Sequence, residues 1–542
     1  MSSNQNHPNR HALLTHTALA ALLIAICCLP ALAGEEGKTV SIVDHGAVGD
    51  GKMLCTAAIQ KAVDACAAAG GGTVRVPKGT FLTGSIRLAS QVTVLLEEGA
   101  VLLGSSRIED YFPGEPPAPA GQLPPRSAFR NLLDGRDLHD VAIRGRGTID
   151  GSGGAHRDKT KPRPKNFYFE NCTDVCVEGL TLRASGSWML HCRLSRNVTL
   201  KDLDVFNHVS FNNDGLDIDS CRDVALTNCR VDTDDDAIVL KSLSDQPCRN
   251  VRVSGCTISS HCNALKMGTE SGGGFLDVEI TGCTVRSPAR SKVIYGKQRG
   301  LAGVALEIVD GGTLDNVRVS KIDIEGVSVP IFLRLGNRAR QYGRKDKPPV
   351  GTFRNVRISD ITARSVSPIG CSITGLPGHP IQDVTMSNVK LEFEGGGTAE
   401  DAARKISERE TAYPESTMFG ALPAWGFYCR HVRGLKFHNL RLSTSQADLR
   451  PAMVFDDARE IEIDHLDAPF AANAAPLLRL IAARDATLRN LSSRDAVDTL
   501  LCLEGKETAR IVLGDCEAKS VRQLISKGAD VPEGALTHRA KQ

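Results

Sequence analysis

Two short apolar segments of this chain carry an unusual number of acidic side chains. The first reads NNDGLDID over residues 212–219, and the second reads TDDDAIVL over residues 233–240. With the residue before the second segment they hold seven aspartates: Asp214, Asp217, Asp219, Asp232, Asp234, Asp235 and Asp236. When carboxyl groups lie close together, ionisation of one raises the proton affinity of the next. Such a cluster can therefore offer both a proton donor and a base.

Both segments have the periodicity of a β-strand with one buried face. Leu216 and Ile218 alternate with aspartates in the first segment, and Ile238 and Leu240 alternate with other side chains in the second. A period of two is typical of strands. Because an unpaired carboxylate is costly to bury, we expect the aspartates to gather on one outer face.

The two segments align with each other at an offset of 22 residues, and a third segment, NALKMGT, follows from residue 263 at an offset of 27. In this register the outward columns are Asp214, Asp236 and Asn263; Asp217, Val239 and Lys266; Asp219, Lys241 and Gly268. The inward columns are Leu216, Ile238 and Leu265; Ile218, Leu240 and Met267. Such columns are typical of a solenoid.

A short unit recurs from about residue 140 onward. It consists of Asn, Asp or Glu, an apolar residue, any residue and a second apolar residue, and it begins at Asp140, Asp174, Asn197, Asp223, Asn250, Asp277, Asn316, Asn355, Asp383, Glu460 and Asp485. Many intervals are 23–28 residues, which is enough for a coil of two or three short strands. We therefore predict an all-β fold, a right-handed parallel β-helix with loops inserted between coils. A leucine-rich repeat is the alternative, but its LxxLxLxxN frame is missing.

The charge balance excludes some classes of partner. The chain has 542 residues, with 65 basic and 63 acidic side chains and a net charge of +2. This balance gives no reason to expect a nucleic-acid partner or binding to an anionic membrane. We expect a monomer.

The first 33 residues have the features of a secretory signal peptide. An apolar run over residues 12–32 follows Arg10 and ends in Ala31-Leu32-Ala33. We predict cleavage near residue 33 and a secreted or periplasmic product that is free of the membrane. An uncleaved membrane anchor is the alternative, although the run is short for a span.

The mature chain divides into three parts. We assign residues 34–104, with a helix-like AAIQKAVDACAAAGGG and several short β runs, to an N-terminal cap and the first coils. Residues 105–514 form the parallel β-helix catalytic domain with inserted loops. Residues 515–542 are assigned to a C-terminal tail.

Fifteen of the 17 cysteines lie beyond the predicted signal peptide, so their odd number requires at least one free thiol. Cys229, Cys256 and Cys283 recur at intervals of 27 residues in matching contexts. We interpret them as small apolar residues stacked in the core, with disulfide pairing as the alternative. No CxxC spacing indicates a metal site.

The acidic segments resemble those of glycoside hydrolase family 28, the polygalacturonase-type pectin hydrolases with a pectin lyase-like solenoid. The resemblance begins at VDHGAVGDG and PKGTFLTGSI, continues through GRGTIDG at 145–151 and Trp188, and ends near residue 310. NND at 212–214 stands at the family's Asn-x-Asp, and Asp235-Asp236 stand at its paired aspartates. The chain is identified as a divergent member.

The resemblance implies an inverting hydrolysis of a pectic polysaccharide or oligosaccharide. In that reaction Asp235 is the general acid, and Asp214 and Asp236 hold the attacking water. Because carboxyl groups fill both roles, we expect no metal and no cofactor. To substrate binding we assign Asn212, Asp217, Lys241, His261, Asn263, Lys266 and Glu307.

The chain departs from the family in two places. The family's Gly-His-Gly is replaced by Cys262-Asn263-Ala264, with His261 two positions early and, by alternation, on the same face. His261 either replaces the family histidine or is a surface histidine. The family's Arg-x-Lys, which grips a galacturonate carboxylate, aligns with Ala305 and Glu307. We therefore predict that polygalacturonate is a poor substrate and that a mixed or neutral-sugar pectic linkage is preferred.

Two inserted segments bear on the mode of attack. Residues 110–128 are a proline-rich loop, and residues 398–412 have the composition of an exposed helix. If these insertions close one end of the groove, attack occurs at chain ends. The aromatic residues that follow are Tyr413, Phe419, Trp425, Phe427 and Tyr428. They form either a wall on which sugars stack or a set of anchors for the loop.

Some alternatives stay open at this point. Lys241 and Lys266 either bind an acidic sugar or neutralise the aspartates. A polysaccharide lyase on the same fold would hold calcium with its acidic residues and use Lys or Arg as the base. A non-catalytic carbohydrate-binding β-helix would need no catalytic aspartate at all.

Overall fold

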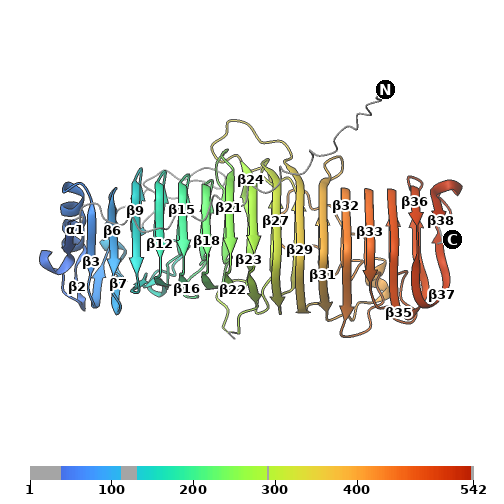
Figure 1. Cartoon of the computed structure of the whole chain (residues 1–542), viewed down its shortest axis with the longest axis horizontal. Helices are drawn as coiled ribbons and strands as arrows, with labels where there is room; N and C mark the ends of the chain where they lie inside the picture. Colours follow the sequence, from blue (N-terminus) through green and yellow to red (C-terminus); the bar gives the residue numbers. More distant parts are fainter. Residues whose placement is uncertain (1–37, 112–130, 290–291, 539–542) are drawn as a thin grey trace, which may run out of the picture.

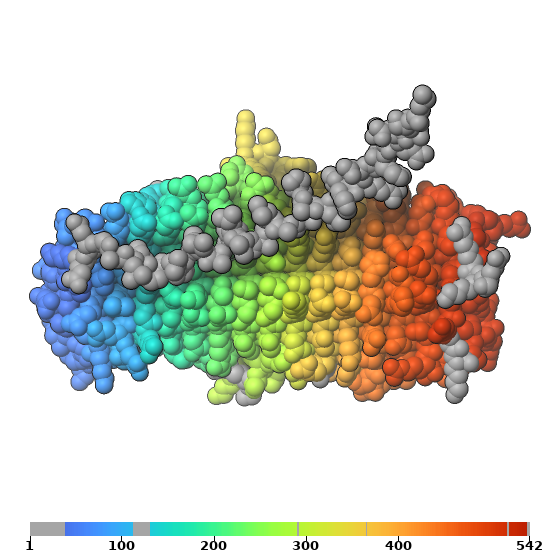
Figure 2. Space-filling model, in the orientation of Figure 1, coloured from blue at the N-terminus to red at the C-terminus, as the bar shows by residue number. Residues whose placement is uncertain are grey.

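The computed structural model describes residues 38–111, 131–289 and 292–538. Within these ranges the chain forms 38 strands that stack in parallel along the long axis of the molecule (Figure 1). The colours that follow the sequence form successive bands along that axis, so each coil occupies its own slice (Figure 2). The prediction of a parallel β-helix is confirmed.

Each coil contributes one strand to each of three parallel sheets. The first sheet, which carries the aspartates, contains β5 (Ile86–Arg87), β8 (Asn131–Arg136), β11 (Lys165–Glu170), β14 (Leu190–Arg193), β17 (Leu216–Asp219), β20 (Ile238–Ser242), β23 (Asn263–Ser271), β26 (Ala302–Ile308), β28 (Val329–Leu335), β30 (Cys371–Thr374) and β34 (Leu478–Ile481).

The second sheet follows the first along the chain in each coil. It contains β1 (Thr39–Ser41), β3 (Gly72–Val76), β6 (Val92–Leu96), β9 (His139–Gly145), β12 (Thr173–Glu178), β15 (Arg196–Lys201), β18 (Arg222–Thr227), β21 (Cys248–Ser254), β24 (Gly274–Thr281), β36 (Ala509–Leu513) and β38 (Leu536–His538).

The third sheet leads back to the first. It contains β2 (Asp50–Leu54), β4 (Gly79–Thr83), β7 (Ala100–Gly104), β10 (Thr148–Asp150), β13 (Thr181–Arg183), β16 (Asp204–Asn207), β19 (Arg230–Thr233), β22 (Thr257–Ser260) and β25 (Thr284–Arg286). Seven longer strands complete the set: β27 (Thr313–Glu325), β29 (Thr352–Val366), β31 (Ile381–Phe393), β32 (Phe427–Thr444), β33 (Met453–Asp467), β35 (Arg484–Glu504) and β37 (Cys516–Lys527). Some bend from one sheet into the next, since β27 pairs with both β24 and β25.

The residue that begins each recurring unit has a positive φ, which explains why the unit usually begins with Asn or Asp. At Asp174, Asn197 and Asp223, for example, φ lies between 53° and 57°. Asn and Asp adopt this left-handed conformation more readily than other non-glycine residues. Their side chains also link neighbouring coils, because Asn197 Nδ2 donates to Asp174 Oδ1 at 2.9 Å.

The core is an aliphatic column that runs through the stack and contains several thiols. Cys229, Cys256 and Cys283 are each 1% exposed, as expected of stacked core residues. Every cysteine of the described ranges, from Cys55 to Cys516, is free. The disulfide alternative is therefore not realised in this part of the chain.

The single long helix, α1 (Thr56–Ala68), lies at the N-terminal end of the stack (Figure 1). Its buried face, with Ile59, Ala62, Val63 and Cys66, packs against β1, β3, β5 and β6. α1 thus covers the end of the core that a solenoid would otherwise expose.

The inserted segment near residue 400 differs from the expectation. Only α2 (Ala399–Ala402) is helical, one turn that begins at the capping box of Thr398 and Asp401. Beyond it the backbone carbonyls bond to other groups, since Arg334 donates to the carbonyl of Glu408 and Arg430 to that of Ile406. Beyond α2 the segment is therefore irregular, and the predicted helix over 398–412 is wrong.

Other predicted segments lie at or beyond the described residues. The predicted signal peptide and most of the proline-rich loop are outside them. Residues assigned to a C-terminal tail form β37 and β38 within the stack. In the described part of the chain, no helix is long and apolar enough to cross a membrane.

Candidate active site

The acidic segments lie where the third sheet passes into the first. Asp214 precedes β17, whereas Asp235 and Asp236 lie between β19 and β20. The backbone carbonyl of Asp235 accepts hydrogen bonds from Thr233 Oγ1 at 2.6 Å and Ser260 Oγ at 2.7 Å. These bonds fix the turn that presents the paired aspartates.

The predicted register of the three strands is confirmed. Asp217, Val239 and Lys266 lie side by side, and the apolar columns point into the core. Only Gly268 is displaced, because the pairing of β20 with β23 shifts beyond Leu240.

The aspartates on this outer face are buried, whereas the sequence led us to expect an open acidic face. Asp214 is 2% exposed and Asp217 is 0% exposed. Lys241 compensates their charge, since its Nζ lies 3.3 Å from Asp214 Oδ2 and 3.5 Å from Asp217 Oδ1. The same Nζ lies 3.5 Å from Glu270. The ion pairs with Lys241, and not contact with solvent, therefore offset the cost of burying these carboxylates.

Two predicted binding residues, Asp217 and Lys241, are buried and belong to this ion pair. Burial raises the pKa of Asp217 well above its ordinary value, and the charge of Asp214 adds to the effect. Lys241 is 4% exposed. Of the two roles left open for this lysine, the structure supports neutralisation of the aspartates.

Asp236 is oriented by Asn263 and by a second lysine. Its Oδ1 accepts hydrogen bonds from the backbone N of Asn263 at 3.1 Å and from Nδ2 of the same residue at 2.6 Å. Lys266 Nζ lies 3.0 Å from Asp236 Oδ2. Asn263 and Lys266, both predicted to bind substrate, therefore contact the same carboxyl group.

Asp235 differs from its neighbours because no Lys or Arg of the described residues forms an ion pair with it. Its Oδ1 accepts from the backbone N of Asp236 at 2.9 Å, and its Oδ2 lies 3.5 Å from Asn212 Nδ2. Burial, followed by the charges of Asp214 and Asp236, raises the pKa of Asp235 well above its ordinary value. Asp235 is thus suited to hold and deliver a proton.

Of the two alternatives considered for His261, a surface histidine does not fit the structure. Its ring is 0% exposed, with Nδ1 2.8 Å from the carbonyl oxygen of Lys297 and Nε2 3.7 Å from Asp234. His261 belongs to the turn before β23, where the alternation of a strand does not apply.

Glu307 lies beside Lys266, with Oε2 3.9 Å from its Nζ. The side chain is 0% exposed. Burial raises the pKa of Glu307 to about 8, although the charge of Lys266 acts in the opposite direction.

Sequence reasoning missed a buried network beside Asp219. Lys165 Nζ lies 2.7 Å from His191 Nδ1, and His191 Nε2 lies 3.3 Å from Asp219 Oδ2. Arg193 Nε lies 3.1 Å from the same oxygen. Burial lowers the pKa of Lys165 to about 7 and that of His191 to about 3, with the charge of Lys165 adding to the latter shift.

A basic group near Asn212 also escaped prediction. Arg163 Nη2 donates to Asn212 Oδ1 at 3.0 Å and so orients the amide that faces Asp235. Trp188 contacts both of the buried lysines. The centre of its ring lies 4.3 Å from Lys165 Nζ and 4.5 Å from Lys241 Nζ. These cation–π contacts further stabilise the buried ammonium groups.

A pocket of about 220 Å³ opens beside Asp235 and Asp236. Its other polar lining residues are Asn263, Lys266, Tyr295, Lys297, Tyr413, Glu415 and Thr417. Several of them come from loops whose sequence has no motif. The segment around Glu415 is fixed in place because Ser416 Oγ donates to the carbonyl of Leu301 at 3.0 Å.

The aromatic cluster after residue 412 divides between the two roles considered for it. Tyr413 is 54% exposed and lines the pocket, with its hydroxyl 3.5 Å from Lys266 Nζ. Trp425 and Tyr428 are each 2% exposed and Phe427 is fully buried, so they anchor the segment in the core.

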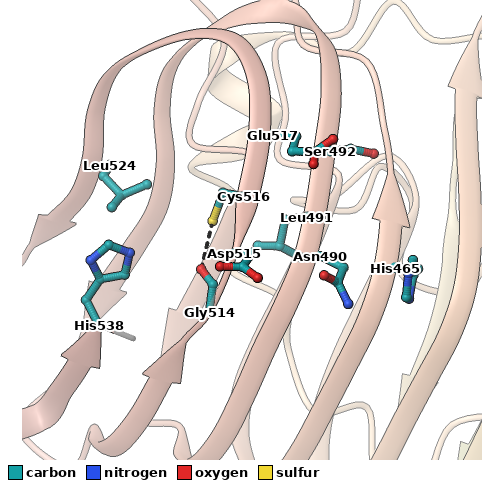
Figure 3. A pocket seen from close by; sticks show the side chains of 10 residues that line it. All are labelled: His465, Asn490, Leu491, Ser492, Gly514, Asp515, Cys516, Glu517, Leu524 and His538. Carbon is teal, nitrogen blue, oxygen red and sulfur yellow. Dashed lines mark hydrogen bonds between the residues drawn. The ribbon is translucent and has the colours of Figure 1, made fainter. Parts of the chain in front are cut away.

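A larger cavity of about 610 Å³ lies near the C-terminal end, on the coils of β33, β35 and β37 (Figure 3). Its carboxyl side chains, Asp515 and Glu517, are partly or fully exposed. A catalytic site usually contains buried carboxyl groups that shift one another's pKa. None of the described residues that line this cavity is such a group. We therefore assign the chemistry to the smaller pocket.

Two groups of side chains in the described ranges have ligand atoms within 4.8 Å of one another, as a metal ion requires. One consists of Asp235, Asp236 and Cys262 and belongs to the active site. The other consists of His208, Asp234 and His261 and lies behind it.

Comparison with known proteins agrees with this geometry. The model of the family described as Glycosyl hydrolases family 28 matches residues 66–411. A probable polygalacturonase from Vitis vinifera is 36% identical over 221 residues, which are 38% of this chain and 45% of that protein. An exo-poly-alpha-D-galacturonosidase from Dickeya chrysanthemi is 40% identical over 126 residues, 21% of this chain and 20% of that protein. The chain thus matches less than half the length of either relative.

The fold is also found among solved structures. The exopolygalacturonase from Thermotoga maritima superposes with a TM-score of 0.59 at 21% sequence identity. The superposition covers 76% of this chain and 92% of the Thermotoga chain.

Proposed function

Since the chain belongs to glycosyl hydrolases family 28, we propose that it hydrolyses a glycosidic bond of a pectic polysaccharide or oligosaccharide. One observation carries the proposal. Asp214 and Asp236 are each paired with a lysine, whereas Asp235 is not. A hydrolase needs this difference, because one carboxyl group must donate a proton while another activates water.

The proposed reaction inverts the anomeric carbon. Asp235 donates its proton to the glycosidic oxygen as the bond from that oxygen to the anomeric carbon breaks. Asp214 and Asp236 hold a water molecule on the opposite face of the sugar and accept its proton as its oxygen bonds to carbon. Asp235 then regains a proton from solvent, and Asp214 and Asp236 release to solvent the proton that they accepted. The resulting hemiacetal has the opposite configuration.

We propose that attack occurs at chain ends. The volume of about 220 Å³ is smaller than that of pockets that enclose drug-sized ligands. Tyr413 and Glu415, from the segment before β32, and Tyr295, from the segment between β25 and β26, line this pocket. The relative from Dickeya is named as an exo-acting enzyme, in agreement with this proposal.

For specificity we propose that a mixed or neutral-sugar pectic linkage is preferred to polygalacturonate. Glu307 is buried beside Lys266 at the position where the family has a cation for a uronate. Lys266 is already engaged with Asp236 at 3.0 Å. A uronate at this position would meet a lysine that already pairs with Asp236 and, in Glu307, a second carboxyl group.

A chain-end galacturonosidase is the second candidate. Lys297 also lines the pocket, although it was not among the residues predicted to bind substrate. The names of the Vitis and Dickeya relatives favour galacturonate as the released sugar.

The test is a product profile over time with polygalacturonate and with rhamnogalacturonan oligosaccharides. Release of single sugars from rhamnogalacturonan, with NMR showing an inverted anomer, supports the first proposal. Galacturonate released singly from polygalacturonate supports the second candidate. Rapid formation of mid-length fragments contradicts chain-end attack, and an unsaturated product that absorbs ultraviolet light indicates a lyase.

Export and oligomeric state complete the proposal. We expect the protein outside the cytoplasm as a monomer of the mature chain. N-terminal sequencing of exported protein should begin near Gly34, and size-exclusion chromatography with light scattering should give the monomer mass. An intact N-terminus on membrane-bound protein contradicts the signal peptide.

A further inference from the structure

Three buried side chains occupy one column at the edge of the third sheet. His208, Asp234 and His261 directly follow the last residues of β16, β19 and β22, which pair with one another. The three residues therefore lie at the same turn of three successive coils. They are 3%, 0% and 0% exposed.

The potential ligand atoms of this column converge. Asp234 Oδ1 lies 2.8 Å from His208 Nδ1 and 3.7 Å from His261 Nε2. The ligand atoms of all three residues lie within 4.8 Å of one another. A zinc ion binds imidazole nitrogen and carboxylate oxygen at roughly 2.0–2.2 Å, which small side-chain shifts would allow here.

One nitrogen of His261 points toward this column without a hydrogen-bond partner. Nδ1 of the ring lies 2.8 Å from the carbonyl oxygen of Lys297, and since a carbonyl only accepts, Nδ1 is the donor. Among the described residues Nε2 has no hydrogen-bond partner, although the ring is 0% exposed and Nε2 lies 3.7 Å from Asp234 Oδ1. Because buried polar atoms normally have a partner, this nitrogen is available as a ligand for a cation.

Each of the three side chains also makes a hydrogen bond to a neighbouring group, as metal ligands commonly do. Asp232 Oδ1 lies 2.9 Å from His208 Nε2, and Asn213 Nδ2 donates to Asp234 Oδ2 at 3.2 Å. Metal-bound histidines commonly donate their second N–H to a carboxylate or a backbone carbonyl. His208 and His261 have one of each.

We infer that His208, Asp234 and His261 bind one divalent transition-metal ion of the zinc type. The ion takes the place of the proton between His208 and Asp234, and that proton passes to solvent. Two nitrogens and one oxygen are ligands that zinc accepts, and a water molecule completes the tetrahedron.

The ion joins three coils and takes no part in the hydrolysis. The turns that it joins lead to Asp214, to Asp235 and to Asn263, so it stabilises the region that carries the active site. This inference is independent of the proposed hydrolase function.

The test uses the full mature chain without a polyhistidine tag. The protein is incubated with zinc chloride, desalted and analysed for metal. We expect about one zinc ion per chain in the wild type and in His465→Ala, whose exposed histidine is the matched control. His261→Ala should lose at least nine-tenths of this zinc by the same reasoning. Removal of zinc with a chelator should lower the Tm of the wild type by several degrees, and zinc should restore it.

A second measurement on the wild type does not depend on the folding of a variant. Cobalt(II) should bind and give the visible d–d absorption of a tetrahedral nitrogen and oxygen site, and zinc should displace it. A wild-type protein that retains no zinc after desalting overturns the inference. Equal zinc content in a folded His261→Ala protein does so as well, because the ion then lies elsewhere.

Discussion

Within the described ranges Asp235, unlike Asp214 and Asp236, has no lysine partner, and this difference determines its proposed role. Replacing it with Asn removes the transferable proton while keeping the shape. We expect Asp235→Asn to lower kcat by about 10²- to 10⁴-fold, the usual contribution of a general acid. The exposed Asp245→Asn is the matched control. Steady-state kinetics with thermal unfolding would show the effect, and near-normal turnover in Asp235→Asn would refute the role.

The raised pKa of Glu307 leads to a prediction of how the free energy of unfolding depends on pH. Its pKa is about 8 in the folded state against an ordinary 4.5, so between these values the folded protein binds a proton that the unfolded chain has lost. Stability must therefore fall as pH rises through this range. Glu307→Gln lacks this dependence and should exceed the wild type by on the order of a few kcal/mol near pH 9, with little difference near pH 4.

Thermal unfolding of both proteins across this pH range is the measurement. A difference in Tm that does not change with pH would mean that Glu307 is ionised in the folded protein.

The residues of the site differed in how far the sequence could predict them. Asp214, Asp236 and Lys266 follow from the alignment of neighbouring coils, because parallel pairing carries a sequence register directly into space, whereas Asp235 is assigned from the family resemblance. His191 could have been found in the same way, since it pairs with Asp217 one coil earlier. Tyr413, Glu415 and Lys297 could not, because they come from loops with no register.

At the scale of elements, the segment after residue 412 does two things, and a pair of variants separates them. Tyr413 is exposed over the pocket, so Tyr413→Ala should raise KM by about 2- to 10-fold, as expected for loss of one aromatic contact, and should leave Tm unchanged. Trp425 is buried and packs 6.1 Å from Phe393 between ring centroids. Trp425→Ala should lower stability by about 3–5 kcal/mol.

Steady-state kinetics and denaturant unfolding of the two variants distinguish a role in sugar binding from a role in anchoring the segment. If Tyr413→Ala is destabilised and binds normally, the tyrosine is an anchor and not part of the sugar-binding surface.

The same segment shows where prediction of an element fails. Residues 398–412 are rich in good helix formers, yet only Ala399–Ala402 is helical. Propensity is a weak preference, and here Arg334 and Arg430 bond to carbonyl groups that a helix would use internally. Those arginines lie outside the segment, 74 and 24 residues away from the carbonyl groups that they contact, so the sequence of the segment gives no sign of them.

For the whole molecule, the end of the stack is as important as its interior. Ala62 is fully buried between α1 and the first coils, whereas Ala57 on the same helix is exposed. Ala62→Asp should detach the helix and expose the core, giving oligomers or aggregates in size-exclusion chromatography. Ala57→Asp should elute as the wild type does. Monomeric, fully stable Ala62→Asp would show that the stack needs no cap.

The architecture was easier to predict than any single loop, for a physical reason. The bend at each Asn or Asp imposes the same left-handed residue on every coil, as at Asp174 and Asn197, so the pattern is repeated many times along the sequence. Repetition reveals the coil even where one copy is weak. Each inserted loop occurs once and is shaped by neighbours that lie far away in sequence.

The free thiols distributed from Cys55 to Cys516 make each region of the stack separately observable. A buried thiol reacts with an alkylating reagent only when its own coil opens. The labelling rate of each buried cysteine, followed by peptide mass spectrometry, therefore reports the local opening free energy at that position, whereas the partly exposed Cys176, Cys502 and Cys516 serve as references. The unmodified protein thus carries a series of probes along its axis, and these can show whether the coils unfold together or from one end.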